Sequence, residues 1–177
     1  MKQDINDVVC TRQYNTPCGP LIIGSLGDKL CLCDWVYCRH RISVDRRIAL
    51  ALRTVYREVE TETNTEAVKQ LDEYFLGKRK QFTIPLLFIG TDFQKSVWRM
   101  LLEIPYGKTL SYGYIAEHLG KPNAVRAVAN ACYANAIAIF APCHRVIASD
   151  GMPSGYSGGA DTKKYLLEYL EAKHMND

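Results

Sequence analysis

The hydrophobic periodicity of the chain changes near residue 90, and this change constrains the fold more than any other feature. Before it, strand-like runs within residues 20–35 are combined with helical patterns at residues 45–57 and 65–77; after it, helical spacing of the apolar residues predominates. The 177 residues suffice for one to two domains. We therefore expect an α+β protein, with a sheet-and-helix domain over residues 1–89 and a mainly helical domain over residues 90–177.

The first half predicts a β-hairpin within residues 20–35, because two apolar runs flank a Gly27-Asp28 corner. Pro85 has no amide proton to donate, so a strand that contains it is expected at a sheet edge. The other elements expected in this half are two helices and this short edge strand, at residues 45–57, 65–77 and 82–88.

The second half predicts two short helices joined by a turn. Ser111 can cap a helix that runs to Leu119 and ends at Gly120, and Pro122 suits the first turn of a second helix that continues to Cys132. Such a pair is a helix-turn-helix candidate. A longer helix precedes it, beginning with a capping box at Thr91-x-x-Gln94 and continuing to residue 104.

Charge is consistent with a nucleic-acid partner for this half. Residues 93–149 contain six Lys and Arg residues against two acidic residues, although a solvated helical face could give the same counts. The net charge of the whole chain is only +3. No apolar run approaches the ~20 residues of a membrane span, and the N-terminus has no signal-peptide core. We expect a cytoplasmic protein without a membrane partner.

Seven cysteines, five of them within the first 38 residues, do not suggest a disulfide framework. Cys31-x-Cys33 with Cys38 and His40 offers zinc ligands, but the C-x2-C pair typical of structural sites is missing. The favoured interpretation is that these cysteines are small buried hydrophobic residues.

The segment Pro142-Cys143-His144-Arg145 is the clearest candidate for chemistry. A reactive cysteine needs a cation or an imidazole that favours its thiolate, and both types of side chain follow Cys143. The alternative is a buried strand cysteine that happens to precede a histidine. Downstream, four glycines between residues 151 and 159 form either a loop that lets backbone amides approach a ligand or an ordinary surface loop.

Taken together, residues 91–167 closely resemble the O6-alkylguanine-DNA alkyltransferases, also called methylated-DNA–protein-cysteine methyltransferases. The resemblance extends loosely to Thr16-Pro17-x-Gly19-x-Leu21, and the absence of an upstream Cys-rich domain suggests the stand-alone type. The matching motifs are Phe93-Gln94-x3-Trp98, Ile104-Pro105-Tyr106-Gly107-Lys108-Thr109, Ser111-Tyr112, Gly120-Lys121-Pro122, Arg126-Ala127-Val128, Asn135, Pro142-Cys143-His144-Arg145-Val146, Gly155-Tyr156-Ser157-Gly158-Gly159 and Lys163.

The resemblance implies a ribonuclease-H-like N-terminal domain and a C-terminal helical domain that carries the helix-turn-helix and the active site. Cys143 would take the alkyl group from O6-alkylguanine, with O4-alkylthymine as a further candidate, and His144 would accept the thiol proton through a water. Each molecule would react once, without a cofactor. No metal is implied, because the N-terminal cysteines do not fall where some members bind zinc.

The resemblance also implies that the protein acts as a monomer and binds double-stranded DNA through the minor groove. Arg126 would fill the space left by the flipped nucleotide, Tyr112 would help to rotate that nucleotide, and Asn135 would tie the helix-turn-helix to the cysteine loop. The remaining positions would read the guanine edge (the Ser157 amide and the carbonyls of Cys143 and Val146) or contact the DNA backbone (Gly113, Lys121 and Ser149).

One departure concerns the glutamate that orients the histidine, which in the family usually lies seven residues after the lysine matching Lys163. Here that position is Leu170, with Glu168 and Glu171 nearby. On an α-helix Glu171 lies about 100° from position 170 and Glu168 about 160° in the other sense, so Glu171 is closer to the required direction. A slightly shifted or unwound final turn could bring it to His144. A backbone carbonyl or a water serving His144 is the alternative.

Three other functions fit the sequence less well. A damage-sensing homologue without transfer activity would replace the nucleophile, whereas Cys143 is present. A helix-turn-helix regulator would need a specific operator and usually a dimer interface, and the sequence shows no obvious apolar stripe that would form one. A cysteine hydrolase is disfavoured because neighbouring residues on a strand point to opposite faces.

Overall fold

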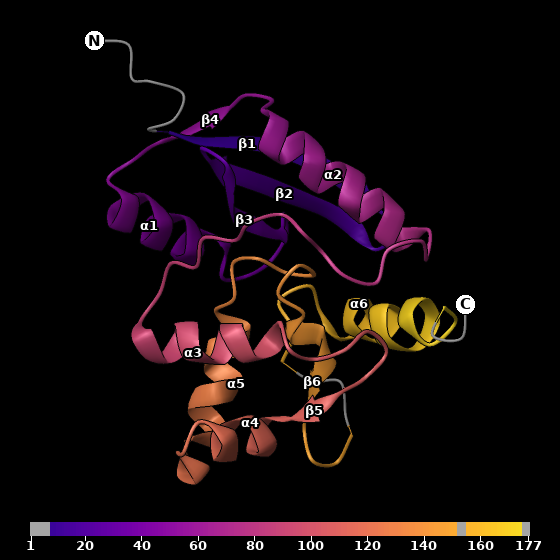
Figure 1. Ribbon diagram of the computed structural model, residues 1–177. Coiled ribbons are helices and arrows are strands. Elements are labelled where there is room, and N and C mark those ends of the chain that lie inside the picture. The colour runs from indigo at the N-terminus through magenta and orange to yellow at the C-terminus, as the bar shows by residue number, and fades with distance from the viewer. Residues whose placement is uncertain (1–7, 152–154, 175–177) are drawn as a thin grey trace. The chain divides into compact units, whose positions relative to one another are not determined.

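The computed structural model describes residues 8–151 and 155–174. The chain divides into two compact units between Ile89 and Gly90 (Figure 1). The N-terminal unit combines a sheet with helices and the C-terminal unit is mainly helical, which confirms the expected α+β class.

The N-terminal unit is built on a four-stranded sheet in the order β3-β2-β1-β4. β1 pairs antiparallel with β2, β2 pairs antiparallel with β3, and β4 runs parallel to β1. The predicted hairpin is β2–β3, whereas β1 and β4 were not predicted. The strands are β1 (Val9–Thr16), β2 (Gly19–Leu26), β3 (Lys29–Trp35) and β4 (Tyr56–Glu58).

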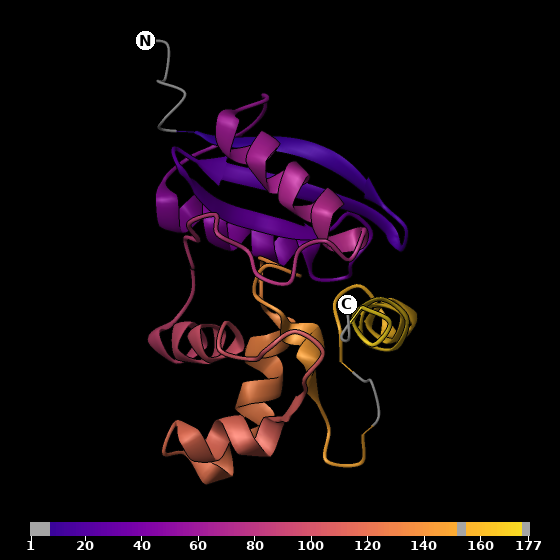
Figure 2. The same ribbon diagram turned by 45° about the vertical axis from the view of Figure 1, so that its right-hand side comes forward.

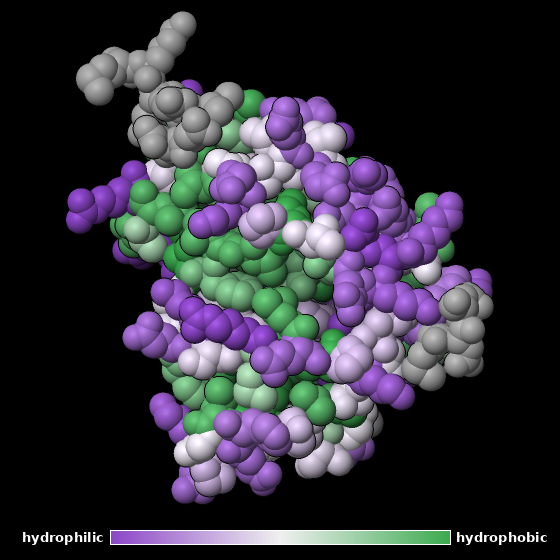
Figure 3. Space-filling model, in the orientation of Figure 1, coloured by the Kyte–Doolittle hydropathy of each residue, from purple (hydrophilic) through white to green (hydrophobic). Residues whose placement is uncertain are grey.

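Two helices, α1 (Arg41–Leu52) and α2 (Glu62–Phe75), cover this sheet (Figures 1 and 2). α2 packs against β1, β2 and β3, and α1 packs against β3. Every residue of β3 after Lys29 is buried, as expected for a strand covered on both faces. Figure 3 shows apolar residues at the surface of this unit, and the exposed ones on α1 include Ile42 and Leu50.

Two predictions for this unit were wrong in detail. The helix expected over 45–57 begins earlier and ends at Leu52, because Arg53 adopts a left-handed conformation with φ 51° and residues 56–58 then pair with β1. The edge strand expected over 82–88 is reduced to one bridge between Leu30 and Leu86. The proline in this segment cannot donate a ladder hydrogen bond.

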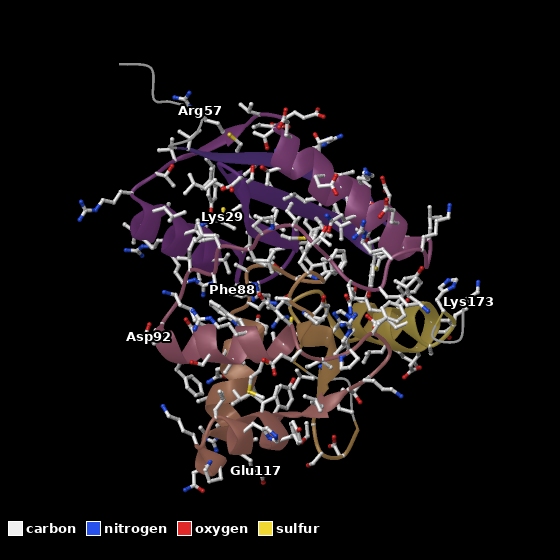
Figure 4. The ribbon with its side chains drawn as sticks, in the orientation of Figure 1. Lys29, Arg57, Phe88, Asp92, Glu117 and Lys173 are labelled. Atoms are coloured by element: carbon white, nitrogen blue, oxygen red, sulfur yellow. The ribbon has the colours of Figure 1, made fainter. Side chains whose placement is uncertain are left out.

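The C-terminal unit begins with α3 (Asp92–Leu101), which has the predicted capping box. Thr91 Oγ1 accepts from the Gln94 amide at 3.2 Å, and Gln94 Oε1 accepts from the Thr91 amide at 3.0 Å. The start of α3 at Asp92 is labelled in Figure 4. The buried Trp98 indole donates to the Ala131 carbonyl at 2.8 Å and so ties α3 to α5 (Val125–Tyr133).

The expected pair of short helices is α4 (Tyr112–His118) and α5. Ser111 caps α4 by accepting from the Tyr114 amide at 3.0 Å, and Gly120 ends the turn after it with φ 67°. The second helix starts later than predicted, because Pro122–Ala124 form a 3-10 turn before α5 begins at Val125.

The rest of this unit consists of short strands and turns, followed by the helical segment at its C-terminal end. They are β5 (Leu110–Ser111), the 3-10 turn η3 (Cys143–Arg145), β6 (Val146–Ile147), α6 (Ala160–Lys164) and the π-helix η4 (Tyr165–Glu171). Within the described ranges, no helix is long and apolar enough to cross a membrane.

Candidate active site

Cys143 lies in a buried 3-10 turn and not on a strand, the placement on which a cysteine hydrolase was disfavoured. The turn follows Pro142 and leads into β6, which pairs in parallel with β5. Leu110 pairs with Val146 in these strands. Because β5 leads directly into α4 and β6 directly follows the cysteine turn, this pairing holds the turn beside the start of α4. Strand geometry therefore does not disfavour a cysteine hydrolase, because adjacent side chains of a turn need not diverge as they do on a strand.

Asn135 fastens the loop that leads to the cysteine. Its Nδ2 donates to the Ala141 carbonyl at 2.9 Å and to Cys143 Sγ at 3.3 Å, and its Oδ1 accepts from the Ile137 amide at 3.0 Å. Between these anchors the buried Ile139 has φ 70°, a strained conformation for a β-branched residue. An N–H group donated to sulfur favours the thiolate over the thiol.

His144 and Glu171 form a fully buried pair, with Nε2 2.7 Å from Oε1. The Glu171 carboxylate also accepts three contacts of 2.9–3.1 Å from the Arg145 guanidinium and one of 3.0 Å from the Gly107 amide. Arg145 additionally donates to the Ile104 carbonyl at 2.8 Å. Both carboxylate oxygens are thus occupied, as a buried anion requires.

The electrostatics of this pair assign the proton on the imidazole. Burial alone would raise the pKa of the Glu171 carboxyl, but His144 and the Arg145 guanidinium hold it well below its usual range. Burial lowers the pKa of His144, against the opposing effect of Glu171. Since an ionised carboxylate only accepts hydrogen bonds, His144 donates its Nε2 proton, and the lone pair of the neutral ring lies on Nδ1.

The π-helix η4 explains how the carboxylate of Glu171 reaches the imidazole of His144. A π-helix closes i→i+5 hydrogen bonds, and the Ala172 amide donates to the Leu167 carbonyl at 3.1 Å. Each such turn holds one residue more than an α-helical turn. The residue that faces His144 is therefore Glu171, one position after Leu170, and the carboxylate left open by the sequence is Glu171 and not Glu168.

Lys163 is a buried cation next to the cysteine turn. Its Nζ donates to the Val146 carbonyl at 2.6 Å and lies 5.8 Å from the centre of the Tyr112 ring. Burial lowers the pKa of Lys163, and negative charge at Cys143 or Cys132 would raise it. Burial raises the pKa of Tyr112 to about 12, so its hydroxyl is protonated and available as a donor.

The glycine-rich loop passes Tyr112. A Cβ on Gly155, whose φ is 70°, would lie 3.7 Å from the Tyr112 hydroxyl. Tyr156 is buried, with its ring centre 6.4 Å from that of His144 in an edge-to-face arrangement. Ser157 is half-buried in the following turn. Residues 152–154 of this loop lie outside the described part of the chain.

The remaining candidates line the outside of the unit. Arg126 is exposed on the first turn of α5, Ser149 is exposed after β6, and Gly113 is half-buried in α4. Lys121 is exposed, with its Nζ 5.1 Å from the centre of the Phe93 ring. The structure does not bring these four residues into contact with Cys143 by any hydrogen bond within the described ranges.

Sequence reasoning missed the role of Arg145. Its guanidinium was interpreted as a cation beside the thiol, whereas it binds Glu171. The Gly107 amide and the Ile104 carbonyl that complete this network belong to the motif Ile104-Pro105-Tyr106-Gly107, which was recognised without a physical role. Gly107 and Glu171 are 64 residues apart, so nothing in the local sequence indicates their contact. Only the presence of the motif could have pointed to a role for Gly107.

Comparison with known proteins finds matches over both units of the chain. Residues 9–88 match the family model described as the ribonuclease-like domain of 6-O-methylguanine DNA methyltransferase, and residues 92–172 match its DNA-binding domain. A methylated-DNA–protein-cysteine methyltransferase of Mycobacterium leprae is 44% identical over 161 residues, covering 89% of each chain. One of Methanosarcina barkeri is 55% identical over 106 residues, or 60% of this chain and 67% of its own length.

Solved structures agree with these matches. The crystal structure of O6-methylguanine methyltransferase from Mycobacterium tuberculosis superposes with a TM-score of 0.80 at 38% identity, over 96% of this chain and 97% of that chain. The M. tuberculosis protein in complex with DNA gives 0.79 at 38% identity, over 93% and 94%. The chain belongs to the 6-O-methylguanine DNA methyltransferase family, whose two domains correspond to its two units.

Proposed function

We propose that this protein repairs DNA by moving the alkyl group of O6-alkylguanine irreversibly to Cys143. The observation that carries this proposal is the arrangement around that thiol. Asn135 donates a hydrogen bond to the sulfur, and the adjacent His144 is kept neutral by burial and oriented by the ionised Glu171. The family membership and the DNA complex of a relative support DNA as the partner.

The reaction needs only the protein, the damaged base and a water that relays a proton. The thiol proton passes toward Nδ1 of His144 through a water, and the Cys143 sulfur attacks the alkyl carbon. A sulfur–carbon bond forms, the carbon–O6 bond breaks with its electron pair on O6, and the base takes up one proton to become guanine. Water does not hydrolyse the resulting thioether, so the cysteine is not regenerated and each protein molecule reacts once.

The protein has groups suited to holding the base during this step. We assign the Ser157 amide and the carbonyls of Cys143 and Val146 to the guanine edge, and the protonated Tyr112 hydroxyl to a further contact. The Val146 carbonyl already accepts from Lys163, but a carbonyl oxygen has two lone pairs. Lys163 thereby orients this acceptor.

The target atom lies inside the duplex, so the nucleotide must leave the stack. We assign to the exposed Arg126 the filling of the vacated space, and to Gly113, Lys121 and Ser149 contacts with the DNA backbone. Insertion of α5 into the minor groove suits a repair protein that ignores sequence, since this groove reports little about base identity. We propose that the protein acts as a monomer.

The test is transfer of an isotopically labelled methyl group from O6-methylguanine in duplex DNA, followed by peptide mapping. We expect the label on the peptide that contains Cys143 and nowhere else, and no label on a Cys143→Ala variant that still binds DNA. Label on another residue would refute the assignment. A protein that binds the lesion without accepting label would instead be a damage sensor.

A further inference from the structure

The side chain of Asp34, near the end of β3, meets those of Cys38 and His40 from the connection between β3 and α1. Asp34 Oδ2 accepts from Cys38 Sγ at 3.3 Å and lies 3.0 Å from His40 Nε2. All three potential ligand atoms lie within 4.8 Å of one another. In the described part of the chain, this is the one group of three or more His, Cys, Asp or Glu side chains with such spacing.

We infer that Asp34, Cys38 and His40 form a zinc-binding site that is independent of the alkyl-transfer chemistry. A thiolate, an imidazole and a carboxylate are the ligand types that zinc takes in tetrahedral sites, and a thiolate argues against Mg²⁺ or Ca²⁺. The three side chains would leave the fourth position to water. This set differs from the one that the sequence offered, because Asp34 takes the place of Cys31 and Cys33.

Two of the three distances between ligand atoms are close to those of a zinc site. With zinc bonds of 2.0–2.3 Å, ligand atoms of a tetrahedral site lie about 3.3 Å apart for oxygen and nitrogen, and about 3.6 Å apart when one is sulfur. The Asp34–His40 and Asp34–Cys38 separations of 3.0 and 3.3 Å need a change of only about 0.3 Å each. The third separation, between Cys38 and His40, needs to close by at most about 1.2 Å from its 4.8 Å limit.

The backbone around the cluster is already fixed. The Cys38 amide donates to the Trp35 carbonyl and the Arg41 amide donates to the Cys38 carbonyl, both at 3.3 Å. The second oxygen of Asp34 accepts from the Trp35 amide at 2.9 Å, which leaves Oδ2 directed at the other two ligands. A site assembled before the metal arrives loses little conformational entropy on binding.

Charge and access also suit a divalent cation. Asp34 is fully buried, whereas the side chain of His40 and the residue Cys38 are each 9% exposed, so an ion can enter from that side. One aspartate and one thiolate neutralise Zn²⁺ in full. The neighbouring Arg41 is paired with Asp45 through two hydrogen bonds of 2.6 and 2.9 Å, which reduces its repulsion of an entering cation.

The first experiment loads the full-length reduced protein with Zn²⁺, desalts it and measures metal per chain by elemental analysis. We expect one zinc per chain, and at least tenfold weaker binding after Cys38→Ser or His40→Gln. Cys18→Ser removes a half-buried cysteine outside the cluster, and Cys143→Ala removes the proposed nucleophile. Both controls should bind zinc like the parent. A parent protein without stoichiometric zinc, or Cys38→Ser and His40→Gln variants with parental affinity, would overturn the proposal.

The second experiment replaces zinc by Co²⁺, whose absorption reports the ligands directly. We expect a thiolate-to-cobalt charge-transfer band in the parent and in Cys143→Ala, and its loss in Cys38→Ser. A band that persists in Cys38→Ser would place the metal on another cysteine and refute the site. Serine nearly matches cysteine in size and can keep the hydrogen bond to Asp34, and His40→Gln gives an independent variant should the first fold poorly. Alkyl transfer is assayed separately, so either proposal can fail alone.

Discussion

Glu171 holds the imidazole of His144 at 2.7 Å from a π-helical position eight residues after Lys163. An α-helix would present Leu170 at the corresponding point, and leucine cannot accept a hydrogen bond. The extra residue in the π-helical turn restores the carboxylate to the histidine. A shift in helix register thus compensates for a one-residue change in sequence spacing.

Replacing Glu171 by Gln should both destabilise the protein and slow alkyl transfer. The change removes the anion that binds Arg145 and leaves a buried guanidinium without its counter-charge, which costs about 3–5 kcal/mol of unfolding free energy. Glu168→Gln is the matched control, because Glu168 makes only an exposed pair with Lys164 at 3.8 Å and should cost less than about 1 kcal/mol. Denaturant unfolding and single-turnover kinetics measure both effects. Equal behaviour of the two variants would show that Glu171 does not orient His144.

The pH dependence of transfer should report the depressed pKa of His144. Because burial lowers this pKa from the ordinary value of 6.5, the base form persists below pH 6.5 and the transfer rate should fall only under more acidic conditions. Glu171 opposes this shift, so Glu171→Gln should move the acid limb to still lower pH. A rate that already halves above pH 6.5 would contradict a buried neutral base.

Acid should also weaken the fold through the same two residues. The pKa values of His144 and Glu171 are both lower in the folded than in the unfolded chain, so the unfolded chain binds more protons. Stability is therefore complete above about pH 6.5 and declines as pH falls, first through His144 and below pH 4.5 through Glu171. Chemical unfolding between pH 8 and pH 4 checks this. Stability that rises on acidification would refute the assigned directions.

Asn135→Asp should separate the effect on the sulfur from the effect on the loop. Aspartate keeps the acceptor for the Ile137 amide but loses the N–H groups that bind the Ala141 carbonyl and Cys143 Sγ, and it adds a negative charge beside the sulfur. We expect slower reaction with free O6-benzylguanine and a rate that recovers at higher pH, because the thiolate is disfavoured. A parental pH–rate profile would show that the N–H···S contact does not assist the thiolate.

Arg126→Ala should slow repair of duplex DNA far more than reaction with free O6-benzylguanine, because only the duplex requires base flipping. Arg99→Ala removes another exposed arginine of the same unit, from the last turn of α3, and should leave both rates near parental values. Equal losses on both substrates for Arg126→Ala would show that this residue supports the fold or the chemistry instead.

Local sequence signals predicted the elements that depend on local chemistry. The Gly27-Asp28 hairpin, the Thr91–Gln94 capping box and the Ser111 cap all rest on contacts within a few residues. β4 was missed because its partner β1 is distant in the sequence. β1 was missed although it pairs with β2 across the short turn between Thr16 and Gly19. Pro85 was interpreted correctly as unsuited to a central strand, yet the segment makes only one bridge.

The site was predictable where a residue type alone indicates chemistry, as with Cys143 and His144. Helical geometry also favoured Glu171 over Glu168, which the contact with His144 confirms. The Arg145–Glu171 contacts were not predictable, because long-range packing decides them. A period of 3.6 residues per turn does not reveal a π-helix, so the π-helical turn at Tyr165–Glu171 was expected only as a shifted final turn. The cluster at Asp34 was missed for a different reason, since only cysteines and histidine were considered as its ligands.

The most direct test of the account is the intact mass of the protein after incubation with an excess of duplex DNA containing O6-methylguanine. We predict a single gain of about 14 Da, the mass of CH2, in nearly every molecule, after which no further lesion is repaired; Cys143→Ala should show no gain. Repair of several lesions per molecule, or an unchanged mass in protein that has repaired DNA, would contradict a single irreversible transfer to Cys143.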